Sequence, residues 1–171
     1  MFFSSNKSKS LYLKLGFSFF ILIFITTILQ TSYTYFSTKK ELYSEIENNI
    51  NVSLKQLENS VITFVESYQV NNYNRIIKNE MAHQNLLAII LEDYVTGKII
   101  GEDKYISGFF RNNEFEVIEY NIKNIEHKHQ MNTSIFSKEL ELKNSQNETI
   151  AILKIYGTDY DINKKLFTII K

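Results

Sequence analysis

The spacing of hydrophobic residues changes from segment to segment along the chain, and each spacing predicts a different element. The first segment, Leu15–Thr38, contains 24 residues without a formal charge. A helix of that length is about 36 Å long at 1.5 Å per residue, and the hydrocarbon core of a bilayer is about 30 Å thick. Tyr33, Tyr35 and Phe36 lie at its far end, where aromatic rings favour the membrane interface. The pattern predicts a transmembrane helix over residues 15–38.

The residues on either side of this segment predict that it is retained and which way it points. A cleaved secretory signal requires small residues after a short apolar run, yet the first alanine of the chain is Ala82. The residues before the segment are basic without acidic neighbours, whereas Lys39-Lys40 is followed directly by Glu41. By the positive-inside rule, residues 1–14 are expected to be cytoplasmic and the residues after the segment to be exported.

Residues 39–84 have a helical pattern and are expected to form a stalk followed by a second helix. The apolar positions of the stalk are spaced 4, 3, 4, 3 and 4 residues apart, as in a heptad repeat. They are Ile50, Leu54, Leu57, Val61, Phe64 and Tyr68, with Leu42 and Ile46 extending the stripe toward the membrane. Two interpretations remain open: the stripe pairs with a second copy in a homodimer, or it packs against its own domain. After a break at "QVNNYN", a second helix is expected over Tyr73–Gln84.

Residues 85–158 change to a strand-like period and predict a five-stranded antiparallel sheet. The expected strands are Leu86–Leu91, Lys98–Ile100 after a turn at Gly97, Phe115–Tyr120, Ser134–Lys143 and Thr149–Thr158. An irregular insert is expected between the second and third strands, and "NSQNE" predicts a hairpin turn. The last residues, 159–171, turn helical again and predict an exit helix that leads into a truncated second transmembrane helix. The fold class is therefore α+β, with helices flanking the sheet.

Composition narrows the classes of function. The net charge is zero, so the overall balance does not favour nucleic acid, and there is no cysteine to form a disulfide or a thiolate metal site. Glu92 and Asp93 would point to opposite faces of a strand and could not share a substrate, and Asp93 is expected to cap the turn that follows. Asp159 and Asp161 fit a helix cap. We therefore expect no catalysis and no cofactor.

The histidines offer a weak alternative in the form of a metal site. His127 and His129 are two residues apart and would share one face of a strand, with His83 as a third candidate. The stretch around them is highly polar, which favours solvated loop histidines over metal ligands.

The order of these elements resembles PAS-like extracytoplasmic sensor domains, the group often called Cache. "IKNEMAHQNLLAIILEDYVTGKIIGEDKYISG" is similar to the input domain of membrane sensor histidine kinases and diguanylate cyclases from Arcobacter-like bacteria, and "ETIAILKIYGTDYDINKKL" is similar to its last strand and exit helix. The resemblance covers about residues 38–168. It implies signal sensing, most readily for a histidine kinase, with a diguanylate cyclase or chemoreceptor as alternatives. A membrane scaffold that binds no ligand is the rival. No histidine box or cyclase loop occurs in the chain, so the resemblance does not extend to catalysis.

The resemblance also implies a place for a ligand. In PAS-like folds the pocket lies beside the second strand and its covering insert, which here is expected at residues 102–113. Tyr105, Arg111 and Tyr120 would supply an aromatic wall and a cation, suited to a small organic or anionic ligand. The expected partners are therefore the lipid bilayer, a second copy of the chain through the stalk helix, and such a ligand.

Overall fold

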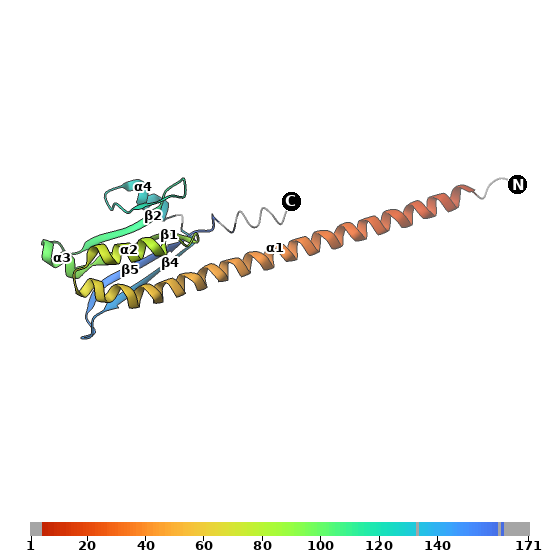
Figure 1. The fold of residues 1–171 in the computed structure, drawn as a ribbon. Coiled ribbons are helices and arrows are strands. Elements are labelled where there is room, and N and C mark those ends of the chain that lie inside the picture. Colours follow the sequence, from red (N-terminus) through yellow and green to blue (C-terminus); the bar gives the residue numbers. More distant parts are fainter. Residues whose placement is uncertain (1–4, 133, 161, 163–171) are drawn as a thin grey trace.

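The computed structural model describes residues 5–132, 134–160 and 162, and it forms an α+β domain at one end of a long helix (Figure 1). The elements follow the order α1 (Ser5–Glu66), α2 (Val70–Glu80), β1 (Leu86–Asp93), α3 (Tyr94–Ile100), β2 (Tyr105–Arg111), β3 (Val117–Glu119), α4 (Ile125–Met131), β4 (Phe136–Lys143) and β5 (Thr149–Gly157).

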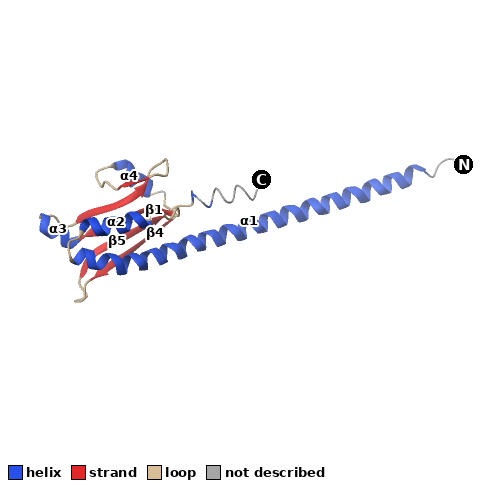
Figure 2. Ribbon diagram, in the orientation of Figure 1, coloured by secondary structure: helices blue, strands red, loops and turns tan. Residues whose placement is uncertain are grey.

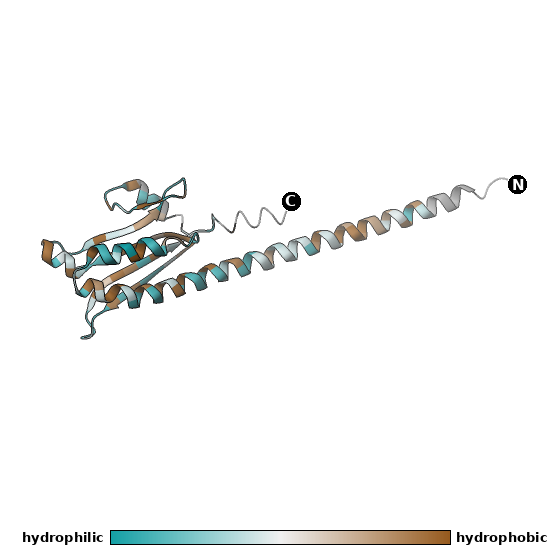
Figure 3. Ribbon diagram, in the orientation of Figure 1, coloured by the Kyte–Doolittle hydropathy of each residue, from teal (hydrophilic) through white to brown (hydrophobic). Residues whose placement is uncertain are grey.

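Helix α1 runs for 62 residues and extends far beyond the sheet. Its projecting half is the most hydrophobic part of the molecule, as Figure 3 shows by the brown colour of the ribbon. Between Tyr12 and Phe36 the large apolar side chains are exposed, apart from the half-buried Tyr35; Phe17 and Leu29, for example, are both 64% exposed. By length and composition this helix can cross a bilayer, and it is the one such helix in the described part of the chain. The expectation of a long apolar N-terminal helix is met.

The second half of α1 contributes its apolar stripe to the core of its own domain. The buried positions are Ile46, Ile50, Leu54, Leu57, Val61 and Val65. Their spacing is 4, 4, 3, 4 and 4 residues, close to the 3.6 residues per turn of a straight helix. The heptad extrapolation fails at its end, where Phe64 is only half-buried and Tyr68 is 54% exposed. A straight helix drifts away from a 3.5-residue repeat, so the buried position moves to Val65.

The chain reverses direction directly after α1. Tyr68 adopts a left-handed backbone (φ 57°), and the backbone N–H of Gln69 donates to the carbonyl of Phe64 at 2.8 Å. Helix α2 begins at Val70, so the asparagines that were expected to form the break lie in its first turn. Tyr73, Ile77 and Met81 are fully buried, and α2 packs against both α1 and β2.

The five strands form one antiparallel sheet in the order β3-β2-β1-β5-β4. Helices α1 and α2 cover one face of the sheet (Figure 2), and the main core lies between them and that face. Leu153 and Ile155 of β5 and Ile89 and Leu91 of β1 point into this core and have no exposed surface. The central strand β1 is buried along its whole length.

The prediction for the second strand was wrong. Residues 98–100 belong to helix α3, and the true second strand, β2, occupies most of the region expected to be an insert. Asp93 explains the helix, because its side chain caps the N-terminus by accepting from the backbone N–H groups of Val95 and Thr96. Gly108 permits β2 to approach β1, since a Cβ atom there would lie 2.2 Å from the carbonyl oxygen of Ile89.

The other strands are close to the prediction. β1, β4 and β5 match the expected segments, and β3 is a three-residue strand within the expected 115–120. Asn144 and Glu148 close the expected hairpin by a backbone hydrogen bond of 3.0 Å. The longest connection between two strands joins β3 to β4 and contains helix α4, instead of lying between the second and third strands. The expected exit helix falls mostly on residues 161 and 163–171, which lie outside the described residues.

Candidate functional site

The three residues predicted to bind a ligand do not form one site. Tyr105 and Arg111 are the first and last residues of β2, so they lie at opposite ends of the strand. Tyr120 follows β3, and its ring meets that of Phe110 edge-on, with centroids 6.5 Å apart. Phe110 faces away from the helices, whereas its neighbour Phe109 belongs to the core beneath them. Tyr120 is therefore on the opposite face of the sheet from the other two.

Arg111 is engaged in holding the backbone. Its guanidinium donates to the carbonyl oxygens of Leu86 at 3.0 Å, Phe115 at 3.0 Å and Met81 at 2.6 Å, with a longer contact to His83. The residue is only 7% exposed. A buried guanidinium needs such partners, and these carbonyls belong to the loop between α2 and β1, to the first residue of β1 and to the turn before β3. The geometry gives Arg111 the role of a clamp between these segments.

The two histidines of the metal alternative lie on helix α4 and not on a strand or loop. His127 is 8% exposed, so its expected solvation was wrong; its ring lies 3.9 Å from that of Phe110, and its Nδ1 accepts the backbone N–H of Asn121 at 3.1 Å. His129 is exposed. Among the described residues, no three histidine, cysteine, aspartate or glutamate side chains come together as metal ligands. His127 packs α4 onto the sheet.

Asp93 joins β1, α2 and α3 through one buried carboxylate. Besides the two backbone N–H groups of α3, it accepts the hydroxyl of Thr96 at 2.6 Å and the hydroxyl of Tyr73 at 3.1 Å. Burial, followed by the charge of Asp93, raises the pKa of Tyr73 far above its usual range. Tyr73 therefore remains a neutral hydrogen-bond donor.

The densest group of charges lies on the face of the sheet opposite α1 and α2. Glu92 of β1 is 8% exposed and accepts from Lys104 Nζ at 2.8 Å and Lys154 Nζ at 3.0 Å. Lys154 also lies 3.5 Å from a carboxylate oxygen of Glu139. We call these four residues the Glu92 cluster. Sequence reasoning missed it, because Lys104 and Lys154 are separated by 50 positions along the chain.

Glu92 and Lys154 remain charged in the Glu92 cluster although burial disfavours the charged form of both side chains. Burial raises the pKa of Glu92, but hydrogen bonds from Lys104 and Lys154 outweigh it and leave the pKa below its ordinary value. Burial lowers the pKa of Lys154, but Glu92 and Glu139 outweigh it and leave the pKa raised. Burial also raises the pKa of the neighbouring Tyr120 and Tyr156. The arrangement is a salt-bridged face beside two neutral phenols, and it offers hydrogen-bond donors to a polar ligand.

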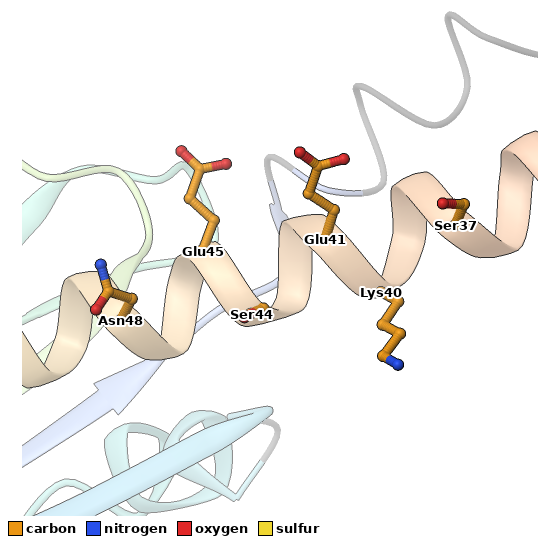
Figure 4. Close-up of a pocket in the computed structure, with 6 residues that line it drawn as sticks. All are labelled: Ser37, Lys40, Glu41, Ser44, Glu45 and Asn48. Carbon is orange, nitrogen blue, oxygen red and sulfur yellow. The ribbon is translucent and has the colours of Figure 1, made fainter.

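A separate depression lies along α1 and is lined by Ser37, Lys40, Glu41, Ser44, Glu45 and Asn48 (Figure 4). The figure shows Glu41 and Glu45 on one side of the helix and Lys40 on the other. All six residues come from one helix, and they mark the point where α1 changes from apolar to polar. The depression is wide open, so we do not assign a binding role to it.

Comparisons with protein-family models, with curated proteins and with solved structures found no match.

Proposed function

We propose that this chain is the extracytoplasmic input region of a bacterial membrane sensor, most readily a histidine kinase, with a PAS-like domain in the periplasm. One observation carries the proposal. Helix α1 continues without a break from an uncharged segment able to span a membrane into the buried core of the sheet domain. A displacement of the domain core would therefore move the membrane segment as part of the same rigid element.

The Glu92 cluster supports a sensing role. Glu92 and Lys154 lie on the two central strands, so a change in their pairing would act on β1 and β5, and α1 packs on β5. A polar or anionic ligand that competes for Lys104 or Lys154 would alter this pairing. Tyr120 is the one residue of the expected ligand set that lies on this face.

A homodimer through α1 is part of the same proposal, and the structure limits which surface it can use. The stripe from Ile46 to Val65 is occupied by the domain core. The contact between copies then uses the exposed side of the helix, where Val52 is 47% exposed, or the membrane segment. Two alternatives remain. The chain could be the input region of a diguanylate cyclase or a chemoreceptor, which would differ only in the output domain, or it could be a membrane scaffold that binds no ligand.

A topology experiment tests the proposal. Alkaline phosphatase, which is active only outside the cytoplasm, is fused after Gly157 in one fusion protein and after Ser10 in a second. Because the lysines before the span hold the N-terminus inside, the Gly157 fusion is expected to be active and the Ser10 fusion inactive. A cytoplasmic reporter such as β-galactosidase at the same two positions is the control and should give the opposite pattern. Activity only at Ser10 would exclude a periplasmic sensor.

A further inference from the structure

A second cavity lies at the end of the domain farthest from the projecting half of α1. It has a volume of about 510 Å³ and lies between the α1–α2 turn, helix α3 and the β4–β5 hairpin, which meet at that end in Figure 1. Cavities that hold small molecules measure about 300–1,000 Å³. This cavity is separate from the Glu92 cluster, none of whose residues lines it.

The walls of the cavity combine apolar surface with a cation. Tyr68 and Tyr94 contribute aromatic rings, and Ile99 and Ile150 contribute aliphatic side chains. Two of these residues are unusually open to solvent, since Ile99 is 62% exposed and Tyr68 is 54% exposed. Large apolar side chains gathered around a hollow are typical of a surface that is covered by a ligand.

Lys98 decides the charge of that ligand. Its side chain has no ion pair or hydrogen bond within the described part of the chain, although it lines the cavity. The acidic residue of the wall, Glu148, keeps its charge but does not pair with Lys98 within the described part of the chain; its carboxylate accepts the side-chain amide of Asn144 at 3.0 Å. An anionic group is therefore favoured beside Lys98, and the rings and aliphatic side chains favour an apolar body attached to it.

The backbone at Tyr68 determines where its ring lies beside the cavity. Its φ of 57° is uncommon for a residue with a side chain, and it places the ring at the turn that ends α1. The hydrogen bond from the backbone N–H of Gln69 to the carbonyl of Phe64 holds this conformation. A molecule that contacts Tyr68, α3 and the hairpin together would fix the end of α1 against the sheet.

We propose that this distal cavity binds a small carboxylate with an apolar, preferably aromatic, body, held by Lys98 and by the rings of Tyr68 and Tyr94. The proposal rests on the cavity alone, so it stands or falls independently of membrane topology and of signal output.

Binding of phenylacetate to the full chain in nanodiscs tests the proposal by isothermal titration calorimetry. The neutral 2-phenylethanol and the cationic phenethylamine have a similar size and isolate the contribution of the charge. Phenylacetate is expected to bind at least about tenfold more tightly than either compound, because a charge-assisted hydrogen bond discriminates by that much or more. Labelled isoleucine methyls provide a second readout, in which Ile99 and Ile150 should shift while Ile89 in the core does not.

Three variants locate the site. Lys98→Met is expected to weaken phenylacetate binding about tenfold, whereas Lys98→Arg keeps the charge and most of the affinity. Tyr68→Gly removes the ring while favouring the same left-handed backbone, and it should weaken binding of all three compounds. Lys55→Met removes an exposed lysine from α1 outside the cavity and is the matched control, with no expected change.

Several outcomes would overturn the proposal. One is equal affinity of phenylacetate for wild type and Lys98→Met. Another is tighter binding of phenethylamine, which would assign the site to a cation at Glu148. Absence of heat and of methyl shifts at the solubility limit of phenylacetate would leave the cavity as a surface hollow.

Discussion

At the scale of single residues, Asp93 is the side chain on which most of the local structure depends. It is fully buried and satisfies two backbone donors and two hydroxyls. Asp93 is the last residue of β1 and the N-cap of α3, so its carboxylate stabilises the junction between these two elements. Its contribution can be measured by replacing it with alanine and comparing the result with the same substitution at an exposed aspartate of the next loop.

Asp93→Ala is expected to lower the free energy of unfolding by about 2–4 kcal/mol. The loss combines a missing helix cap, about 0.5–2 kcal/mol, with buried hydroxyls of Tyr73 and Thr96 that lose their acceptor, about 1–3 kcal/mol. Denaturant unfolding of the full chain in nanodiscs measures it. Asp103→Ala, at an exposed position of the next loop, is the matched control and should change the value by less than about 0.5 kcal/mol. Equal effects of the two variants would contradict the role assigned to Asp93.

The Glu92 cluster predicts a dependence of stability on pH. The pKa of Glu92 is lowered in the fold, so its contribution is fully present above the ordinary value of 4.5 and is lost as the pH falls through the folded pKa. The pKa of Lys154 is raised, so its contribution is present below the ordinary value of 10.5 and is lost as the pH rises through the folded pKa. The cluster therefore stabilises the fold between these limits.

Glu92→Gln is expected to destabilise the protein at neutral pH, with a difference from wild type that shrinks as the pH falls below 4.5. The physical reason is that a protonated Glu92 resembles the uncharged amide. Thermal unfolding at a series of pH values gives the comparison. Glu141→Gln removes a carboxylate whose ion pair with Lys143 is exposed, so its effect should be small at every pH. A constant difference for Glu92→Gln across the acid range would contradict the ion-pair explanation.

At the scale of elements, α1 has two different environments along one helix. Its first half exposes apolar side chains, as a membrane segment does, and its second half buries a stripe against β4, β5 and α2. The change falls near Lys39 and Lys40, where the helix becomes charged. Because the helix is continuous, the stripe that stabilises the domain core also fixes the direction in which the apolar half projects.

Leu57→Ala is expected to destabilise the domain by about 2–5 kcal/mol, as for other buried leucines. Leu57 is 1% exposed, whereas Val52, five residues earlier on the same helix, is 47% exposed. Val52→Ala is therefore the matched control, with an expected loss below about 0.5 kcal/mol. Denaturant unfolding measures both variants.

Crosslinking in membranes provides an independent readout of the same assignment. A cysteine at Leu57 should not form a disulfide between copies, because the position lies in the core, whereas a cysteine at Val52 is accessible. Efficient crosslinking at Leu57 and none at Val52 would show that the stripe pairs between chains and would overturn the intramolecular assignment.

At the scale of the whole molecule, the order β3-β2-β1-β5-β4 places the first and last strands side by side at the centre of the sheet. Glu92 and Lys154 form their ion pair there. The end of β5 lies beside the start of β1, since the backbone N–H of Thr158 donates to the carbonyl of Asn85 at 2.9 Å. Helix α1 reaches the centre of this sheet through its contacts with β5. Strand β5 carries Lys154 of the Glu92 cluster on one face and contacts α1 with the other, so it connects the cluster to the helix that we propose to cross the membrane.

Much of this architecture was determined by the sequence alone, because local patterns were sufficient. An uncharged run of 24 residues can be interpreted without knowing its neighbours, and two strand-like segments on either side of the turn residues "NSQNE" favour a hairpin. The fold class, the long helix and three of the five strands with nearly correct bounds followed from such patterns. The second strand did not, because a single buried carboxylate at Asp93 turned a short apolar run into helix α3.

Only the tertiary structure decided how distant residues are used. Ile50 and Leu57 carry the same apolar pattern whether they face a second chain or their own sheet, and it is the packing of β4 and β5 against α1 that fills that face. The guanidinium of Arg111 could bind an anion, yet its hydrogen bonds go to backbone carbonyls from segments up to 30 residues away in the sequence. Glu92, Lys104 and Lys154 became a cluster only through strand order and register. Side-chain chemistry is local, but the partners that satisfy it are chosen by the fold.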